Sequence, residues 1–118
     1  MPKSMPDSPT LLKAAITYLE EELMPTLDSY HRFKTRVTAN VLSTLKRELE
    51  LRDTQATAER ARLMEILGHD GDVETLSHEL SERIRTGAIA IGEPALRAHV
   101  RQSLADALAI NNPKWLTR

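Results

Sequence analysis

The apolar residues of this chain recur at helical spacing almost from end to end, and this feature constrains the fold most. The clearest example surrounds the segment RVTANVLSTLKREL, residues 36–49, where apolar residues step four positions at a time. These residues are Phe33, Val37, Val41, Leu45 and Leu49, with Leu42 widening the stripe. Such spacing places side chains together on a helix face. No segment alternates apolar and polar residues as a half-buried strand does, so the sequence predicts an all-α protein.

Proline, glycine and capping residues divide this pattern into five helices. Proline opens a helix in its first turn or ends the one before it, glycine ends helices, and Asp, Ser or Thr cap them. The expected helices, with the residues that begin and end them, are Ser8–Pro25, Asp28 or Ser29 to Arg52, Thr54–Gly68, Asp72–Gly87 and Pro94–Asn111. Short connections favour antiparallel neighbours. We expect a compact bundle of about five amphipathic helices, mostly antiparallel.

Each expected helix carries an apolar stripe that should face the core. Besides the residue 33–49 stripe, these are Leu11, Leu12, Ala15, Ile16, Leu19 and Leu23; Ala56, Leu63, Ile66 and Leu67; Val73, Leu76, Leu80 and Ile84; and Leu96, Val100, Leu104, Ala107 and Leu108. Glu48 falls near the middle of the second stripe. We therefore expect Glu48 to be the most buried acid, with a cation or donor beside it.

Length and charge bound the class of protein. At 118 residues the chain is expected to form one helical domain, 9–118, after a flexible N-terminus, 1–8. The 16 Lys and Arg balance 17 Asp and Glu, which predicts no attraction to nucleic acid or to a membrane surface. Without cysteine, disulfides and thiolate chemistry are excluded. No signal-peptide core or membrane-length apolar run is visible, so we expect a cytoplasmic, bacterial protein.

Motifs for catalysis are missing. The chain has no GxxxxGK(S/T), GxGxxG or GxSxG motif. HELSE, residues 78–82, resembles the zinc helix HExxH, but Glu82 replaces the second histidine and His78 falls on the side expected to face water. The cluster HDGD, residues 69–72, offers His69, Asp70 and Asp72 to a cation, but it is better explained as a turn followed by a helix cap. We expect no enzyme activity, metal or cofactor.

Two features are candidate binding sites. Arg36, Asn40 and Arg47 lie in a narrow band beside the apolar stripe, and the two arginines are about 16 Å apart along the axis. They either contact two anionic groups of a ligand such as coenzyme A or form the polar edge of a helix packed near Glu20–Glu22. The second interpretation is favoured, with Arg36 and Asn40 as structural residues and Arg47 as the least explained of the three. Trp115 with Leu116, after the Asn112–Pro113 turn, either anchors a partner protein or covers the end of the domain.

Three long stretches resemble a bacterial family of small, uncharacterised all-α proteins. They are RVTANVLSTLKRELEL, ERARLMEILGHDGDVETLSHELSERIRTG and LAINNPKW. The shared pattern is R-V-x-A-N, R-E-L, L-G-x-D-G-D, R-I-R-x-G and a terminal N-P-(R/K)-(Y/W), over about residues 10–115. The chain has Trp115 where tyrosine is frequent. The resemblance provides no catalytic residues.

The resemblance implies a role beside other enzymes. Members of the family are typically encoded next to an aminoglycoside-phosphotransferase-like kinase and an acyl-CoA dehydrogenase. This implies a non-catalytic accessory subunit of a kinase that acts on hydroxyacyl-CoA in short-chain hydroxy-acid catabolism. The alternative from the residues is a helical module that binds a CoA-like anion such as acyl-CoA through Arg36, Asn40 and Arg47. A further alternative is a helical protein with another, non-enzymatic role, and an enzyme in its own right is the least favoured.

Overall fold

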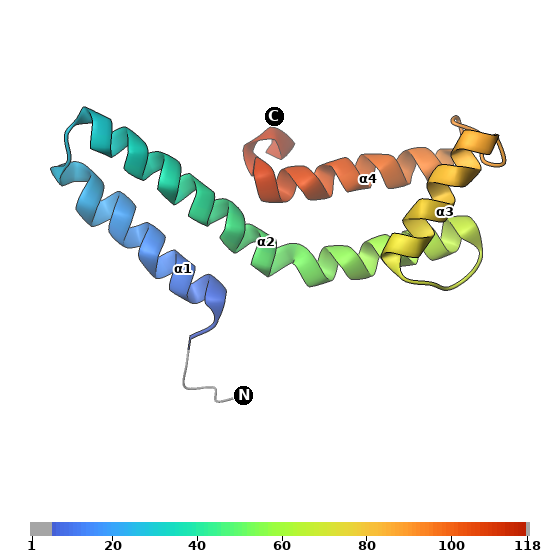
Figure 1. The fold of residues 1–118 in the computed structure, drawn as a ribbon, viewed down its shortest axis with the longest axis horizontal. Coiled ribbons are helices and arrows are strands. Elements are labelled where there is room, and N and C mark those ends of the chain that lie inside the picture. Colours follow the sequence, from blue (N-terminus) through green and yellow to red (C-terminus); the bar gives the residue numbers. More distant parts are fainter. Residues whose placement is uncertain (1–5, 118) are drawn as a thin grey trace. The chain divides into compact units, whose positions relative to one another are not determined.

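The computed structural model describes residues 6–117, and they form four α-helices without a strand (Figure 1). The helices are α1 (Ser8–Thr17), α2 (Ser29–Leu67), α3 (Val73–Thr86) and α4 (Pro94–Asn111). Three shorter turns of helix complete the chain: π-helical η1 (Tyr18–Leu23) and the 3₁₀ segments η2 (Met24–Thr26) and η3 (Pro113–Thr117). The all-α prediction is confirmed. Most of the expected flexible N-terminus, residues 1–5, lies outside the described residues.

The expected second and third helices are one continuous helix, so the prediction of five is wrong. α2 runs through Arg52, Asp53 and Thr54 without interruption. None of these three is proline or glycine, the residues that break helices strongly, and a capping residue is only a weak signal within a run of good helix formers. Thr54 therefore lies inside the helix and caps nothing.

The chain packs as two compact units, which replace the expected five-helix bundle. Unit 1 comprises the residues up to Leu51 together with Ile110–Asn112, and unit 2 comprises Arg52–Ala109 and the residues from Pro113. The prediction of a single domain over 9–118 stays a prediction. No described helix is both long enough and apolar enough to cross a membrane.

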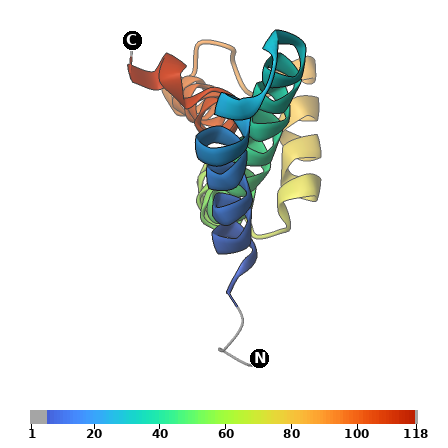
Figure 2. The ribbon, with the colours of Figure 1, turned by 90° about the vertical axis from the view of Figure 1, so that its left-hand side faces the viewer.

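Unit 1 is a helical hairpin, with α1 and η1 alongside the first half of α2 (Figures 1 and 2). Asp7, one residue before the expected cap Ser8, begins α1 by accepting a hydrogen bond from the Thr10 amide at 2.9 Å. At the turn, Arg32 donates to the carbonyl oxygens of Met24 at 3.3 Å and Leu27 at 3.0 Å. Ile16, Met24 and Ala39 are its buried apolar residues.

Unit 2 is built around an apolar core. Leu63 and Leu67 of α2 pack with Leu76 and Leu80 of α3 and with Leu96 of α4. Sequence signals for the ends of α3 are confirmed: Asp72 accepts from the Thr75 amide at 2.8 Å, and Gly87 has the left-handed φ of 81° that glycine adopts readily. The predicted α3 stripe is likewise buried or half-buried.

The predicted stripe in the first half of α2 and much of the one in α4 are exposed, whereas Leu63, Ile66 and Leu67 in the second half of α2 are covered as expected. Residues 33, 37, 41, 45 and 49 are all exposed, as are Val100 and Leu104. Each step of four advances about 400° around a helix, so a stripe of five residues drifts by about 160° and leaves any one packing face. The covered positions alternate steps of three and four instead. In α4 such a series runs through Leu96, His99, Ser103, Asp106 and Ile110, and the half-buried residues Ala105, Leu108 and Ala109 lie beside it.

Candidate functional site

The most conspicuous surface of unit 1 is the α2 apolar face, defined as Phe33, Val37, Val41, Leu45 and Leu49. Their exposed fractions run from 36% for Leu49 to 61% for Phe33 and Val41. Ala39, on the other side of the helix from Val41, is buried because that side packs within the hairpin, and Leu42, beside Leu49, is half-buried. Glu48 is also exposed, so the expectation of a buried acid is wrong. The first half of α2 thus presents exposed apolar side chains along its length, spread over about 160° around the helix axis and with Glu48 among them.

The Arg36, Asn40 and Arg47 strip divides into two parts. Arg47 is half-buried and donates through Nε to the Ile110 carbonyl oxygen at 2.8 Å, and its Nη2 lies 3.3 Å from Thr44 Oγ1. Arg36 and Asn40 are exposed, and within residues 6–117 neither side chain has a hydrogen bond or ion pair. The arginine that seemed least explained therefore has the clearest structural role. Ligand binding by the strip stays a prediction.

The C-terminal aromatic lies in η3. Trp115 is 57% exposed and Leu116 is 46% exposed. Both side chains therefore have apolar surface available to a partner, although Trp115 also has an interaction of its own within the structure. Their role as a partner anchor stays a prediction.

The HDGD turn is held by arginine. Arg60 forms an ion pair with Asp70 and donates through Nε to the Gly71 carbonyl oxygen at 2.8 Å. Asp70 also accepts from the Gly71 amide at 2.7 Å, and Asp72 caps α3. The carboxylates of Asp70 and Asp72 thus bind different groups of the protein. No group of three or more potential ligands gathers to hold a metal ion anywhere in residues 6–117.

His69 leaves this turn toward α3. Its Nε2 lies 2.7 Å from Glu79 Oε1, and its Nδ1 lies 2.9 Å from the Asp70 carbonyl oxygen. Both ring nitrogens thus face acceptors, which favour the protonated ring. The hydrogen bond to Glu79, then the Asp70 carbonyl and the Glu79 charge, raise the pKa of His69 above its usual value of 6.5. Arg83 shares Glu79 at 2.6 Å. His78 is exposed, as expected.

A polar network joins α2 and α4 inside unit 2. Arg62 donates through Nε to His99 Nδ1 at 3.1 Å, and its Nη2 lies 3.7 Å from Asp106 Oδ2. Asp106 also accepts from Gln102 at 2.9 Å, and its backbone carbonyl accepts from Gln55 at 3.0 Å. An arginine Nε can only donate, so His99 Nδ1 must accept and the neutral ring carries its proton on Nε2. Burial and the nearby Arg62 charge lower the pKa of His99.

This network is better suited to structure than to ligand binding. The hollow beside Arg62 and His99 has a volume of about 250 Å³, below the ~300–1,000 Å³ typical of ligand pockets. The Arg62 Nη2 is buried without a hydrogen-bond partner in the described residues, which leaves the Asp106 carboxylate as its compensating charge. The network fixes the register of α4 on α2.

Sequence reasoning missed this network. The available signal was the alternation of three- and four-residue steps through Leu96, His99, Ser103 and Asp106, which identifies the inward side of α4. The more apolar stripe through Val100 and Leu104 obscured it, because polar residues are rarely assigned to a packed face without knowledge of their partners.

Comparison with known proteins gives one assignment. No curated protein and no solved structure matches the chain. The family described as "Domain of unknown function (DUF6285)" matches residues 25–115, which include all of α2, α3 and α4. Since this match covers well over half of the sequence, the chain belongs to the DUF6285 family.

Proposed function

We propose that the protein is a non-catalytic accessory subunit that binds a partner enzyme through the α2 apolar face. The observation that carries this proposal is the exposure of all five apolar side chains of that face, Phe33 among them. Exposed large apolar side chains gathered along one helix often mark sites of protein–protein interaction. An exposed aromatic flanked by aliphatic residues on one rigid helix is the arrangement of an amphipathic helix that enters a partner's groove.

The polar groups of the chain support a binding role. The most prominent titratable clusters are engaged in holding the fold: Arg60 and Asp70 fix a turn, and Arg62 and His99 join two helices. Phosphoryl transfer needs a held nucleotide, a metal ion and a positioned acceptor. A subunit can influence that reaction by contact with an enzyme that already has these parts.

The identity of the partner comes from the family resemblance. It indicates an aminoglycoside-phosphotransferase-like kinase that phosphorylates a hydroxyacyl-CoA. The α2 apolar face would order the kinase fold, complete its acyl-CoA pocket, or do both. The CoA-like anion site at Arg36, Asn40 and Arg47 is less favoured, because Arg47 already donates to the Ile110 carbonyl oxygen.

The test uses the aminoglycoside-phosphotransferase-like kinase encoded beside this protein, purified alone and mixed with it. We expect the two proteins to co-elute in size-exclusion chromatography and the mixture to phosphorylate 4-hydroxyacyl-CoA faster, with ATP as donor. Val41→Asp and Leu45→Asp should weaken the complex at least tenfold, because each places a charge in the apolar contact.

A matched control is Leu11→Asp, which puts the same charge on an exposed leucine of α1, outside the face. It should co-elute as the wild type does. Equal kinase rates without co-elution would reject the accessory-subunit proposal. A complex that tolerates Val41→Asp and Leu45→Asp but not Leu11→Asp would move the docking surface to α1.

A further inference from the structure

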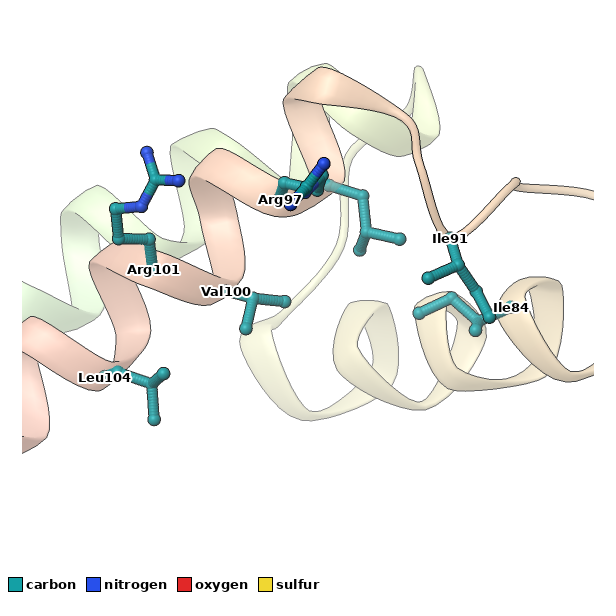
Figure 3. A pocket seen from close by; sticks show the side chains of 7 residues that line it. Ile84, Ile91, Arg97, Val100, Arg101 and Leu104 are labelled. Carbon is teal, nitrogen blue, oxygen red and sulfur yellow. The ribbon is translucent and has the colours of Figure 1, made fainter.

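A second apolar surface lies in unit 2, where α3, the loop after it and α4 enclose a groove of about 470 Å³ (Figure 3). Its lining consists of five aliphatic side chains and two arginines: Ile84, Ile91, Leu96, Val100 and Leu104 with Arg97 and Arg101. Figure 3 shows Ile84 and Ile91 at one end of the groove and Leu104 at the other. The volume falls within the range of small-molecule sites, about 300–1,000 Å³.

The aliphatic side chains form the groove from floor to rim. Leu96 is buried and provides the floor, whereas Ile91 is 79% exposed and Leu104 is 63% exposed. Measured around α4 from Leu96, Val100 and Leu104 lie at about 40° and 80°, and the two arginines follow at about 100° and 140°. One margin of the apolar groove is therefore a row of two guanidinium groups, one helical turn apart.

These arginines lack the carboxylate partners that four other arginines of unit 2 have. Arg60, Arg62, Arg83 and Arg85 each lie within ion-pair distance of an acid. Within residues 6–117, neither Arg97 nor Arg101 has such a pair. A second hollow of about 340 Å³ lies against the same two arginines, with Gly92, Pro94 and Ala98, and no carboxylate lines either hollow among the described residues.

We propose that this groove binds a linear amphiphilic anion, with its alkyl chain on Leu96, Val100 and Leu104 and its carboxylate or phosphate head on Arg97 and Arg101. Arginine suits both head groups because its planar guanidinium donates two parallel hydrogen bonds. The apolar walls favour a chain that leaves water, and the arginine margin selects a negative head. The site is separate from the α2 apolar face and does not depend on a partner enzyme.

The groove also sets the length of the chain. Leu96 and Leu104 are eight residues apart, about 12 Å along the axis of α4. An extended alkyl chain advances about 1.3 Å for each carbon–carbon bond of about 1.5 Å. The groove therefore accommodates about ten carbons.

The test is isothermal titration of the full chain with decanoate, decyl phosphate and, as uncharged control, decanol. We expect saturable binding of both anions at one site, at least tenfold tighter than that of decanol. The double variant Arg97→Gln and Arg101→Gln should lose this preference for anions, and Leu104→Asn should weaken all three ligands. Arg52→Gln, an exposed arginine of α2 outside both hollows, is the matched control and should bind as the wild type does.

Circular dichroism of each variant separates loss of binding from loss of folding. The double variant Arg97→Lys and Arg101→Lys should keep part of the preference for anions over decanol, because it keeps the positive charges. Two results would overturn the proposal. The first is uptake without saturation, or only at concentrations where the amphiphile forms micelles. The second is equal affinity for decanol and decanoate in the wild type, or a wild-type preference that survives loss of both arginines.

Discussion

Arg47 Nε donates a hydrogen bond of 2.8 Å to the carbonyl oxygen of Ile110, which lies 63 residues further along the chain. Ile110 is the penultimate residue of α4, so its carbonyl is one of the last four that find no partner inside the helix. A cation at this end also interacts favourably with the helix dipole. Thr44, one turn earlier in α2, lies 3.3 Å from Arg47 Nη2 and orients the guanidinium.

Arg47→Ala should therefore lower the free energy of unfolding by about 1–3 kcal/mol, the usual cost of losing a partly buried hydrogen bond to a charged group. Arg36→Ala and Asn40→Ala should stay within about 0.5 kcal/mol of the wild type, because both side chains are exposed. This order reverses the one expected from sequence, where Arg36 and Asn40 were the structural members of the strip. Urea unfolding of the three variants measures these differences. If Arg47→Ala leaves the free energy of unfolding unchanged, the contact is not formed in solution.

The local signals for both ends of α3 and for the start of α4 were reliable, whereas the capping signal at Thr54 was not. Asp72 and Gly87 mark the two ends of α3 where expected, and Pro94 opens α4. These residues act on their own backbone, so their effect can be read without the rest of the chain. The same is true of the all-α class, which follows from spacing and from the abundance of helix formers.

The packing faces were not predictable in the same way. Four-residue steps placed Val41 and Leu104 in a core, and both are exposed. Which side of a long helix is covered depends on its neighbours, and the polar residues of α4 that do face them, His99 and Asp106, both meet Arg62 of α2. For this reason the candidate site was predicted only in part: the apolar stripe on α2 was recognised, but it was assigned to the core.

Leu63 and Leu104 provide a test of this assignment, because both were expected in the core and only Leu63 is completely buried. Leu63→Ala should cost about 2–5 kcal/mol of unfolding free energy through lost apolar contact and the cavity left behind. Leu104→Ala should change it by less than about 0.5 kcal/mol. Thermal and urea unfolding compare the two, and similar losses in both variants would mean that Leu104 is covered in solution.

His69 should titrate above its usual pKa of 6.5, because the protonated ring donates to Glu79 and to the Asp70 carbonyl. A raised pKa in the folded state means that this contact stabilises the fold below about pH 6.5, and that the stabilisation disappears as the pH rises through the higher folded value. Nuclear magnetic resonance titration of the histidine ring protons measures the shift. Glu79→Gln should return the pKa toward 6.5, whereas Glu82→Gln, which removes the partner of Arg85, should leave it raised.

His99 should have the opposite effect on stability. Burial first, and then the charge of Arg62, lower its pKa below 6.5, while Glu59 opposes the shift. The charged groups near the ring come from α2: Arg62, Glu59 and Glu65. Arg62 in turn lies 3.7 Å from Asp106 Oδ2 of α4. The folded state therefore resists protonation more than the unfolded chain does.

A group of this kind destabilises the fold on acidification: the loss should begin as the pH falls through about 6.5 and stop below the lower pKa of folded His99. Protonation also puts a hydrogen on Nδ1 and so removes the acceptor that Arg62 Nε uses at 3.1 Å. His99→Gln keeps an acceptor but cannot titrate. Between pH 7.5 and pH 5 the wild type should therefore lose more unfolding free energy than the variant does. His78→Gln, at an exposed position, is the control and should show no such shift. A difference that stays constant over this range would mean that His99 titrates alike in the folded and unfolded states.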